Sequence, residues 1–252
     1  MGEKNRNTHA YKSESYNIGR PDYPEAFFDY VYNEIGLRSG GVIADIGAGT
    51  GKITKKFLER GNKVFAVEPD NAMMRILKAN TAKFTKCSLL ENKAESTGIL
   101  SNSVDFIFCG NSYIWFNRND VIPEFKRIAR DAKAQNIMIA RLGPGDDIYD
   151  DKLIEINKKF SKAVLSKEPN TSPPFKDNLY TDKLFEYVIY QSFEEFLHGC
   201  LSASDAPGPE DDCFDKYNSA LKGLFDKYSI DGKLAGNFKL FCMMGSVDNL
   251  AY

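Results

Sequence analysis

The sequence predicts an α/β fold with a doubly wound, mostly parallel sheet of seven strands. Short apolar runs rich in β-branched residues alternate with stretches whose apolar residues recur at helical spacing. A glycine-rich turn, Asp45-Ile46-Gly47-Ala48-Gly49-Thr50-Gly51, joins the first of these runs to the first helix after it. The 252 residues are enough for one large domain with an insertion, and 42% of them are hydrophobic, as in an ordinary globular protein.

The strands are predicted from continuous apolar runs, because a parallel strand is buried on both faces. They lie at 42–44, 64–67, within 84–90, and at 104–109, 136–140, 184–191 and 238–247. The first five follow one another at the spacing of strand–helix units, which favours parallel pairing.

The helices are predicted from apolar residues that share one face. They lie at 25–35, 52–60, 71–80, in a segment with Pro123 in its first turn, at 147–165, around His198 and at 211–228. Asp70 is the expected N-cap of the helix that begins at position 71. We interpret the polar residues around His9 as a tail.

The glycine-rich turn narrows the choice of ligand. A phosphate-binding P-loop would need glycine and Ser or Thr where Ile46 and Ile53 stand, and a dinucleotide loop would need its third glycine at Lys52. The carboxylate of Asp45, two positions before Gly47, suits an ammonium or sulfonium group and would repel a pyrophosphate. The turn therefore favours S-adenosylmethionine as the cofactor.

The segment from Asp45 to Gly51 resembles the first motif of class I S-adenosylmethionine-dependent methyltransferases. Glu68 ends the second strand about 20 residues further on, where a ribose-binding carboxylate is expected. The resemblance implies a Rossmann-like sheet whose last strand is antiparallel. It also implies a helical insertion or lid above the carboxyl ends of the strands.

A second resemblance lies in the segment from Tyr16 to Pro24. It is similar to an N-terminal signature of small-molecule methyltransferases of the trans-aconitate and ubiquinone/menaquinone types. That resemblance implies a lid in which Arg20 binds the carboxylate of the cofactor and Tyr16 its methionine end. The alternative, a stiff entry to the helix at 25–35, stays open.

The resemblance also implies that Ala94 and Glu95 contact adenine, and a solvated loop acid stays open as the alternative role of Glu95. Asn111, at the tip of the fourth strand, is a candidate contact of the methionine part of the cofactor. Lys93 stands where the family often has Asp. The cofactor-binding residues expected together are Tyr16, Arg20, Asp45, Gly47, Ala48, Gly49, Thr50, Gly51, Glu68, Pro69, Met73, Ala94, Glu95 and Asn111.

The sequence gives fewer signals for the residues that bind the methyl acceptor. Relatives commonly read A-x-A-x-H-W-F after the fourth strand. This chain keeps Trp115-Phe116 but has Ile114 in place of the histidine. We therefore assign no catalytic residue. Because the histidine that could act as a general base is absent, the sequence favours an acceptor that is already anionic or intrinsically nucleophilic. Tyr113, Trp115 and Arg141 are candidate acceptor contacts, with packing and a surface salt bridge as the alternative roles.

The histidines, the acidic cluster and the cysteines show no pattern of a catalytic or metal-binding site. His9 and His198 show no paired carboxylate in the sequence and receive no catalytic role. The acidic cluster at 146–151 predicts charge at a helix N-terminus, so no metal site is expected. The five cysteines have no metal-binding spacing and are expected to be reduced thiols.

Charge and hydropathy limit which partners and which cellular location we expect. The net charge is −2 and no dense basic tract is present, which argues against nucleic acid as the main partner. No apolar run approaches the roughly 20 residues that span a membrane. The first residues are polar, so we expect a cytoplasmic protein. The sequence indicates no oligomeric state.

These patterns predict a lid segment at 1–36, a cofactor-binding core at 37–142, an insertion covering the acceptor at 143–182, and a C-terminal completion of the sheet at 183–252. The predicted function is S-adenosylmethionine-dependent methyl transfer, in line, to a small-molecule acceptor. Two alternatives stay open. One is an NAD-dependent oxidoreductase, because Glu68 also suits the NAD ribose, and the other is a non-catalytic S-adenosylmethionine-binding protein.

Overall fold

The structure, a computed structural model, describes residues 3–162, 170 and 172–252. It divides into two units. The sheet unit comprises Asp22–Leu142, Lys167–Phe185 and Lys239–Tyr252. The helical unit comprises Met1–Pro21, Gly143–Ser166 and Glu186–Phe238.

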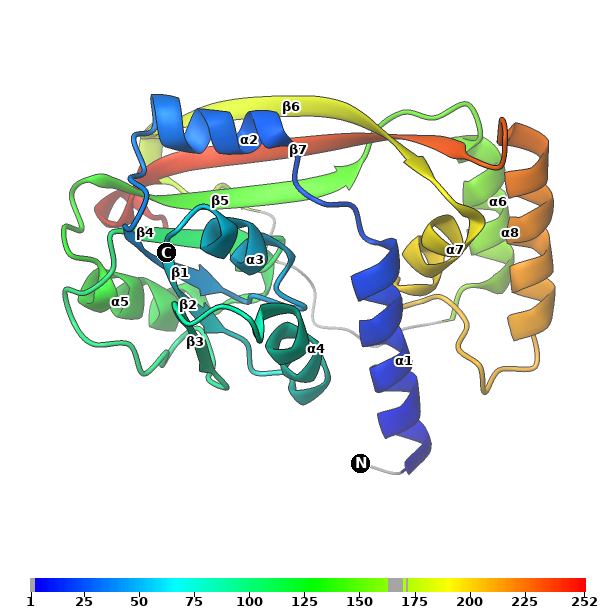
Figure 1. Cartoon of the computed structure of the whole chain (residues 1–252), viewed down its shortest axis with the longest axis horizontal. Helices are drawn as coiled ribbons and strands as arrows, with labels where there is room; N and C mark the ends of the chain where they lie inside the picture. The colour runs from blue at the N-terminus through cyan, green and yellow to red at the C-terminus, as the bar shows by residue number, and fades with distance from the viewer. Residues whose placement is uncertain (1–2, 163–169, 171) are drawn as a thin grey trace. The chain divides into compact units, whose positions relative to one another are not determined.

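Seven strands form one sheet in the order β3-β2-β1-β4-β5-β7-β6 (Figure 1). Their bounds are β1 Val42–Ile46, β2 Lys63–Val67, β3 Cys87–Leu90, β4 Phe106–Gly110, β5 Gln135–Pro144, β6 Tyr180–Gln191 and β7 Leu234–Ser246. The first five strands pair in parallel, and the last strands bring antiparallel pairing. The strand order reverses between β1 and β4, which is where open α/β sheets bind their ligands.

The helices of the sheet unit follow the strands. They are α2 Glu25–Asp29 with a π-helical turn at Tyr30–Glu34, α3 Lys52–Glu59, α4 Asn71–Thr81 and α5 Arg118–Ile128, with short turns at Tyr113–Trp115, Lys176–Asn178 and Val247–Asn249. Asp70 caps α4 as predicted, because its Oδ1 accepts the backbone N–H groups of Ala72 and Met73, both at 2.9 Å. On α5 the residues Ile122, Phe125 and Ile128 are fully buried, as their spacing predicts.

The helical unit contains α1 Glu3–Gly19, α6 Asp150–Phe160, α7 Phe193–Leu201 and α8 Phe214–Tyr228. A core of its own forms around Tyr217, Leu221 and Phe196. Helix α1 packs along α7 (Figure 1), and the Nζ of Lys12 donates hydrogen bonds to the carbonyls of Leu201, Ala203 and Ala206.

The predicted fold class is confirmed, and all seven strands are present. Two local predictions were wrong. Residues around His9 belong to helix α1 rather than to a tail. Pro123 lies inside α5 and not in its first turn, because Asn117 already caps that helix by accepting the N–H of Asn119 at 3.3 Å.

Some predictions stay open. The four predicted segments, 1–36, 37–142, 143–182 and 183–252, remain predictions. Residues 163–169 and 171, which fall in the predicted insertion and its helix, lie outside the described residues. In the described part of the chain, no helix combines the length and apolar character needed to cross a membrane.

Candidate functional site

The glycine-rich turn lies at the carboxyl end of β1 and leads into α3. Gly47 has a φ of +72°, and its N–H donates to the carbonyl of Val67 at 2.8 Å, which ties the turn to β2. A Cβ at this position would lie 2.5 Å from the Cβ of Ser112. Only glycine therefore allows β1, β2 and the segment after β4 to approach this closely.

Gly49 faces open space instead. Its φ is +58°, and no heavy atom lies within 4 Å of where a Cβ would be. Its N–H points at the carboxylate of Glu68, which accepts it at 2.8 Å. The middle of the turn is therefore accessible to a ligand, with an acidic group beside it.

Glu68 directly follows β2 and is 8% exposed. Its Oε1 accepts the N–H of Asp70 at 2.9 Å, while Oε2 accepts the N–H of Gly49. Burial raises the pKa of this carboxyl, against the lowering effect of these two hydrogen bonds. Each carboxylate oxygen can accept a further hydrogen bond, so the group can still bind two ligand hydroxyls.

Asp45 lies deeper than its place at a strand end implies. Its side chain is 1% exposed, and it accepts a hydrogen bond from the hydroxyl of Thr54 on α3. Burial raises the pKa of Asp45 to about 7, and the nearby charge of Glu68 adds to this. The carboxyl therefore lies beneath the turn and away from solvent, and its role toward a positively charged ligand stays a prediction.

A pocket of about 550 Å³, which we call the loop pocket, opens beside the turn. It is lined by Gly47, Pro69, Lys93, Ala94, Glu95, Trp115, Phe116 and Asp120. The structure thus brings five predicted site residues to one place, Gly47, Pro69, Ala94, Glu95 and Trp115.

Three other predicted residues, Thr50, Asn111 and Met73, do not line the loop pocket. Thr50 is buried, its carbonyl accepts from Asn80 at 2.8 Å, and its hydroxyl has no hydrogen-bond partner among the described residues. Asn111 follows β4 with a φ of +56°. Its side-chain amide exchanges two hydrogen bonds with the backbone of Leu142, at 2.8 and 3.1 Å. Met73 lies in the first turn of α4, half-buried.

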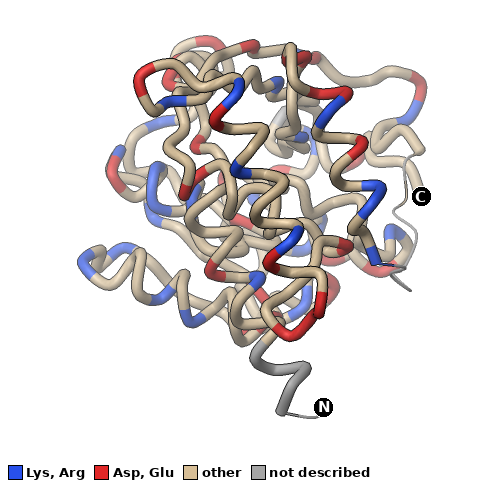
Figure 2. The backbone as a smooth tube through the Cα atoms, turned by 90° about the vertical axis from the view of Figure 1, so that its right-hand side faces the viewer, with Lys and Arg blue, Asp and Glu red and all other residues tan. Residues whose placement is uncertain are grey.

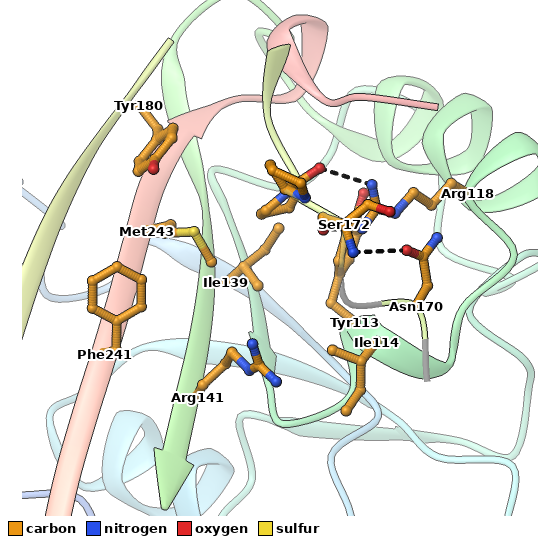
Figure 3. A pocket seen from close by; sticks show the side chains of 12 residues that line it. Tyr113, Ile114, Arg118, Ile139, Arg141, Asn170, Ser172, Tyr180, Phe241 and Met243 are labelled. Carbon is orange, nitrogen blue, oxygen red and sulfur yellow. Dashed lines mark hydrogen bonds between the residues drawn. The ribbon is translucent and has the colours of Figure 1, made fainter. Parts of the chain in front are cut away.

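A second pocket, about 200 Å³ in volume, lies beside the same segment after β4 (Figure 3). We call it the Arg141 pocket. It is lined by Tyr113, Ile114, Arg118, Ile139, Arg141, Asn170, Ser172, Pro173, Pro174, Tyr180, Phe241 and Met243. The segment 113–116 thus contributes to both pockets. Tyr113 and Arg141 line this one and Trp115 lines the other.

Tyr16 and Arg20 belong to the helical unit. The Nε of Arg20 donates to the hydroxyl of Ser202 at 3.0 Å, and its guanidinium lies 5.4 Å from the centre of the Tyr16 ring. Their predicted roles toward the cofactor stay predictions.

The sequence did not single out Arg118, Tyr180 or Met243, which the structure places in the Arg141 pocket. They come from α5, β6 and β7, far apart in the chain. The one available signal was the arginine two positions after the Trp115-Phe116 pair.

Lysine and arginine lie interspersed with aspartate and glutamate over much of the described chain, with short single-sign stretches such as the acidic cluster at 146–151 (Figure 2). This distribution agrees with a net charge of −2.

Residues 44–133 match the family model of the methyltransferase domain. Among curated proteins, an uncharacterized methyltransferase of Mycobacterium tuberculosis is 34% identical over 116 residues, covering 46% of this chain and 45% of that protein. One from Schizosaccharomyces pombe is 27% identical over 116 residues, covering 46% of this chain and 45% of that protein. The chain thus matches about half the length of these relatives.

Solved structures show the same fold over most of the chain. A protein described as a type II methyltransferase from Anaeromyxobacter dehalogenans aligns with a TM-score of 0.64 at 19% identity, over 90% of this chain and 98% of that one. A protein described as a sarcosine dimethylglycine methyltransferase from Galdieria sulphuraria aligns with a TM-score of 0.53 at 12% identity, over 96% and 99%.

The glycine-rich turn and Glu68 lie within the matched residues. So do the strands β2, β3 and β4. Residues 44–133 are similar to the methyltransferase domain, and the resemblance of this chain to the class I methyltransferase family is confirmed.

Proposed function

We propose that this protein transfers a methyl group from S-adenosylmethionine to a small-molecule acceptor. The observation that carries the proposal is the carboxylate of Glu68, held 2.8 Å from the N–H of Gly49 at the open middle of the turn. An acid at this place binds two neighbouring hydroxyls of a ribose, which a neutral side chain binds less well.

The residues around the turn fit this cofactor. The loop pocket has about 550 Å³, within the range of roughly 300–1,000 Å³ usual for small-molecule sites. Gly49 leaves space for a ligand to lie against the backbone. We propose that Ala94 and Glu95, which line this pocket, bind the adenine through a backbone N–H and a carboxylate.

S-adenosylmethionine, when bound, supplies a methyl group on a positively charged sulfur that leaves with the bonding electron pair. The task of the chain is to hold the donor and the acceptor in line, which lowers the barrier by up to about 7–11 kcal/mol in well-oriented systems. The Trp115 ring, which lines the loop pocket and is 46% exposed, can stabilise the positive sulfur through its π face.

Among the described residues, neither pocket is lined by histidine. An acceptor that is already anionic or intrinsically nucleophilic needs no base, so we propose an acceptor of this kind. The five cysteines are free thiols, which suits a reducing compartment, and we propose a cytoplasmic location.

Incubation with S-adenosylmethionine labelled in its methyl group, together with carboxylates, phenols and amines, tests the activity. We expect label to be transferred to at least one small acceptor that needs no base. Transfer restricted to phenols would contradict the choice of acceptor. Cofactor binding without any transfer would instead favour a non-catalytic binding protein.

A further inference from the structure

The Arg141 pocket contains more hydrogen-bond donors than its own residues use. Its described lining includes two guanidinium groups and no acidic side chain. The twelve lining residues that the structure describes all belong to the sheet unit. Figure 3 shows the Arg141 side chain extending from β5 toward Ile114, with Phe241, Met243 and Tyr180 on one side and Arg118, Ser172 and Asn170 on the other.

Tyr113 supplies the first unused donor. Its side chain is 2% exposed, and its hydroxyl has no hydrogen-bond partner among the described residues. Burial raises the pKa of this hydroxyl well above its ordinary value of 10, so it keeps its proton and remains a donor. A buried donor without a partner destabilises the free protein, and a ligand oxygen that accepts from it removes that cost.

Arg118 supplies the second unused donor. Its side chain is 5% exposed, and its two terminal nitrogens donate to the carbonyls of Pro173 and Ser172 at 2.8 and 2.6 Å. Its Nε has no hydrogen-bond partner among the described residues. The carbonyls hold the guanidinium in place without neutralising its charge, so the positive charge acts on the pocket at low dielectric.

Arg141 adds a second, exposed guanidinium. A planar guanidinium fork and a hydroxyl donor together match the two oxygens of a carboxylate. Five other lining residues are apolar, namely Ile139, Phe241, Met243, Pro173 and Pro174, while Asn170, Ser172 and Tyr180 add polar groups. The apolar residues would pack against the hydrocarbon part of a small acid. The pocket volume of about 200 Å³ limits that part to a single ring or a short chain.

We propose that the Arg141 pocket binds a small carboxylic acid with an apolar body, its carboxylate held by Arg141 and the hydroxyl of Tyr113 beside the charge of Arg118. The segment 113–116 lines both this pocket and the loop pocket. The acid is therefore the acceptor class of the methyl transfer, an assignment that rests on the proposed function, whereas the binding itself does not.

Benzoate and benzamide form a matched pair of probes, because they share size and ring and differ in charge. Calorimetric or NMR titration of the full chain should show benzoate binding at least about tenfold more tightly than benzamide. Tyr113→Phe should weaken benzoate binding about tenfold without lowering the unfolding temperature, because the deleted hydroxyl has no partner in the free protein. Arg141→Gln should remove most of the preference for benzoate.

Arg38→Gln serves as the control, since Arg38 is exposed and lines neither of the two pockets. It should leave benzoate binding unchanged. Equal affinity for the two probes, no binding of benzoate at millimolar concentration, or unchanged binding in both pocket variants would each overturn the proposal. Titration of the same samples with S-adenosylhomocysteine reports on the cofactor site separately, so a failure there is distinguishable from a failure here.

Discussion

The side chain of Glu68 holds the glycine-rich turn in place and is also the proposed ribose-binding group. Its oxygens accept the N–H groups of Gly49 and Asp70 at 2.8 and 2.9 Å, and Gly49 has open space where a Cβ would lie. The sequence predicts its place at a strand tip, but not that it shapes the turn before any ligand arrives. Its substitution should therefore affect both folding and binding.

Glu68→Gln replaces one accepting oxygen by an NH₂ group, which cannot accept from a backbone N–H or a ribose hydroxyl. We expect about tenfold weaker binding of S-adenosylhomocysteine and a loss of roughly 1 kcal/mol in the free energy of unfolding. Calorimetry and urea denaturation measure the two effects. Glu59→Gln, at an exposed position on α3, is the matched control and should change neither quantity. Unchanged affinity in Glu68→Gln would refute the ribose-binding role.

Asp45 makes stability depend on pH. Burial raises its pKa from the ordinary 3.8 to about 7, so the native state holds a proton that the unfolded chain releases. The contribution of Asp45 to folding therefore becomes less favourable as pH rises from about 4 to about 7, and changes little above that. The asparagine of Asp45→Asn does not ionise, so its contribution to stability does not depend on pH.

Urea denaturation of both proteins at about pH 5 and about pH 8 checks the prediction for Asp45. We expect the stability of Asp45→Asn relative to the natural protein to be higher at the more alkaline pH. A relative stability that is the same at both pH values would mean that the carboxyl titrates normally in the native state.

At the scale of elements, the glycine turn separates positions needed for folding from positions open to a ligand. Gly47 packs against Ser112, whereas Gly49 faces open space, although both have a positive φ. We expect Gly47→Ala to cost at least about 2 kcal/mol of stability and Gly49→Ala about 1 kcal/mol, the strain of the left-handed conformation alone. Denaturation curves of the two variants give the comparison, and equal losses would contradict it.

The contact between α1 and α7 depends on two glycines. A Cβ on Gly19 would overlap the backbone of Gly199, whereas one on Gly223 of α8 meets no atom within 4 Å. Gly19→Ala should therefore lower stability and loosen α1, seen as faster hydrogen exchange of its amides. Gly223→Ala should stabilise by about 0.5–1 kcal/mol through helix propensity. Protected α1 amides in Gly19→Ala would rule out this packing.

Elements also show where sequence reasoning succeeds. The turn, the strand tips and the cap at Asp70 were predictable because each depends on residues adjacent in the chain. Helix α1 was missed because it is polar, and its packing partners, the carbonyls after α7, lie far along the sequence. The depth of Asp45 was hidden for the same reason, since Thr54 covers it only once α3 packs on the sheet.

For the molecule as a whole, the fold class followed from the alternation of strands and helices, and the antiparallel last strand from the family resemblance. The order of the strands in the sheet and the pockets did not follow from either. The Arg141 pocket combines residues of β5, β6, β7, α5 and the segment after β4. No local pattern marks such a set, because its members meet only through the order of strands in the sheet. Each unit also has its own core, a division that composition does not reveal.

Calorimetric titration with S-adenosylhomocysteine and, separately, with NAD distinguishes the two classes of cofactor at the glycine-rich turn. We predict saturable one-site binding of S-adenosylhomocysteine, weakened in Glu68→Gln, and no measurable heat from NAD. Binding of NAD in the absence of S-adenosylhomocysteine binding would contradict it and would favour a dinucleotide-dependent oxidoreductase.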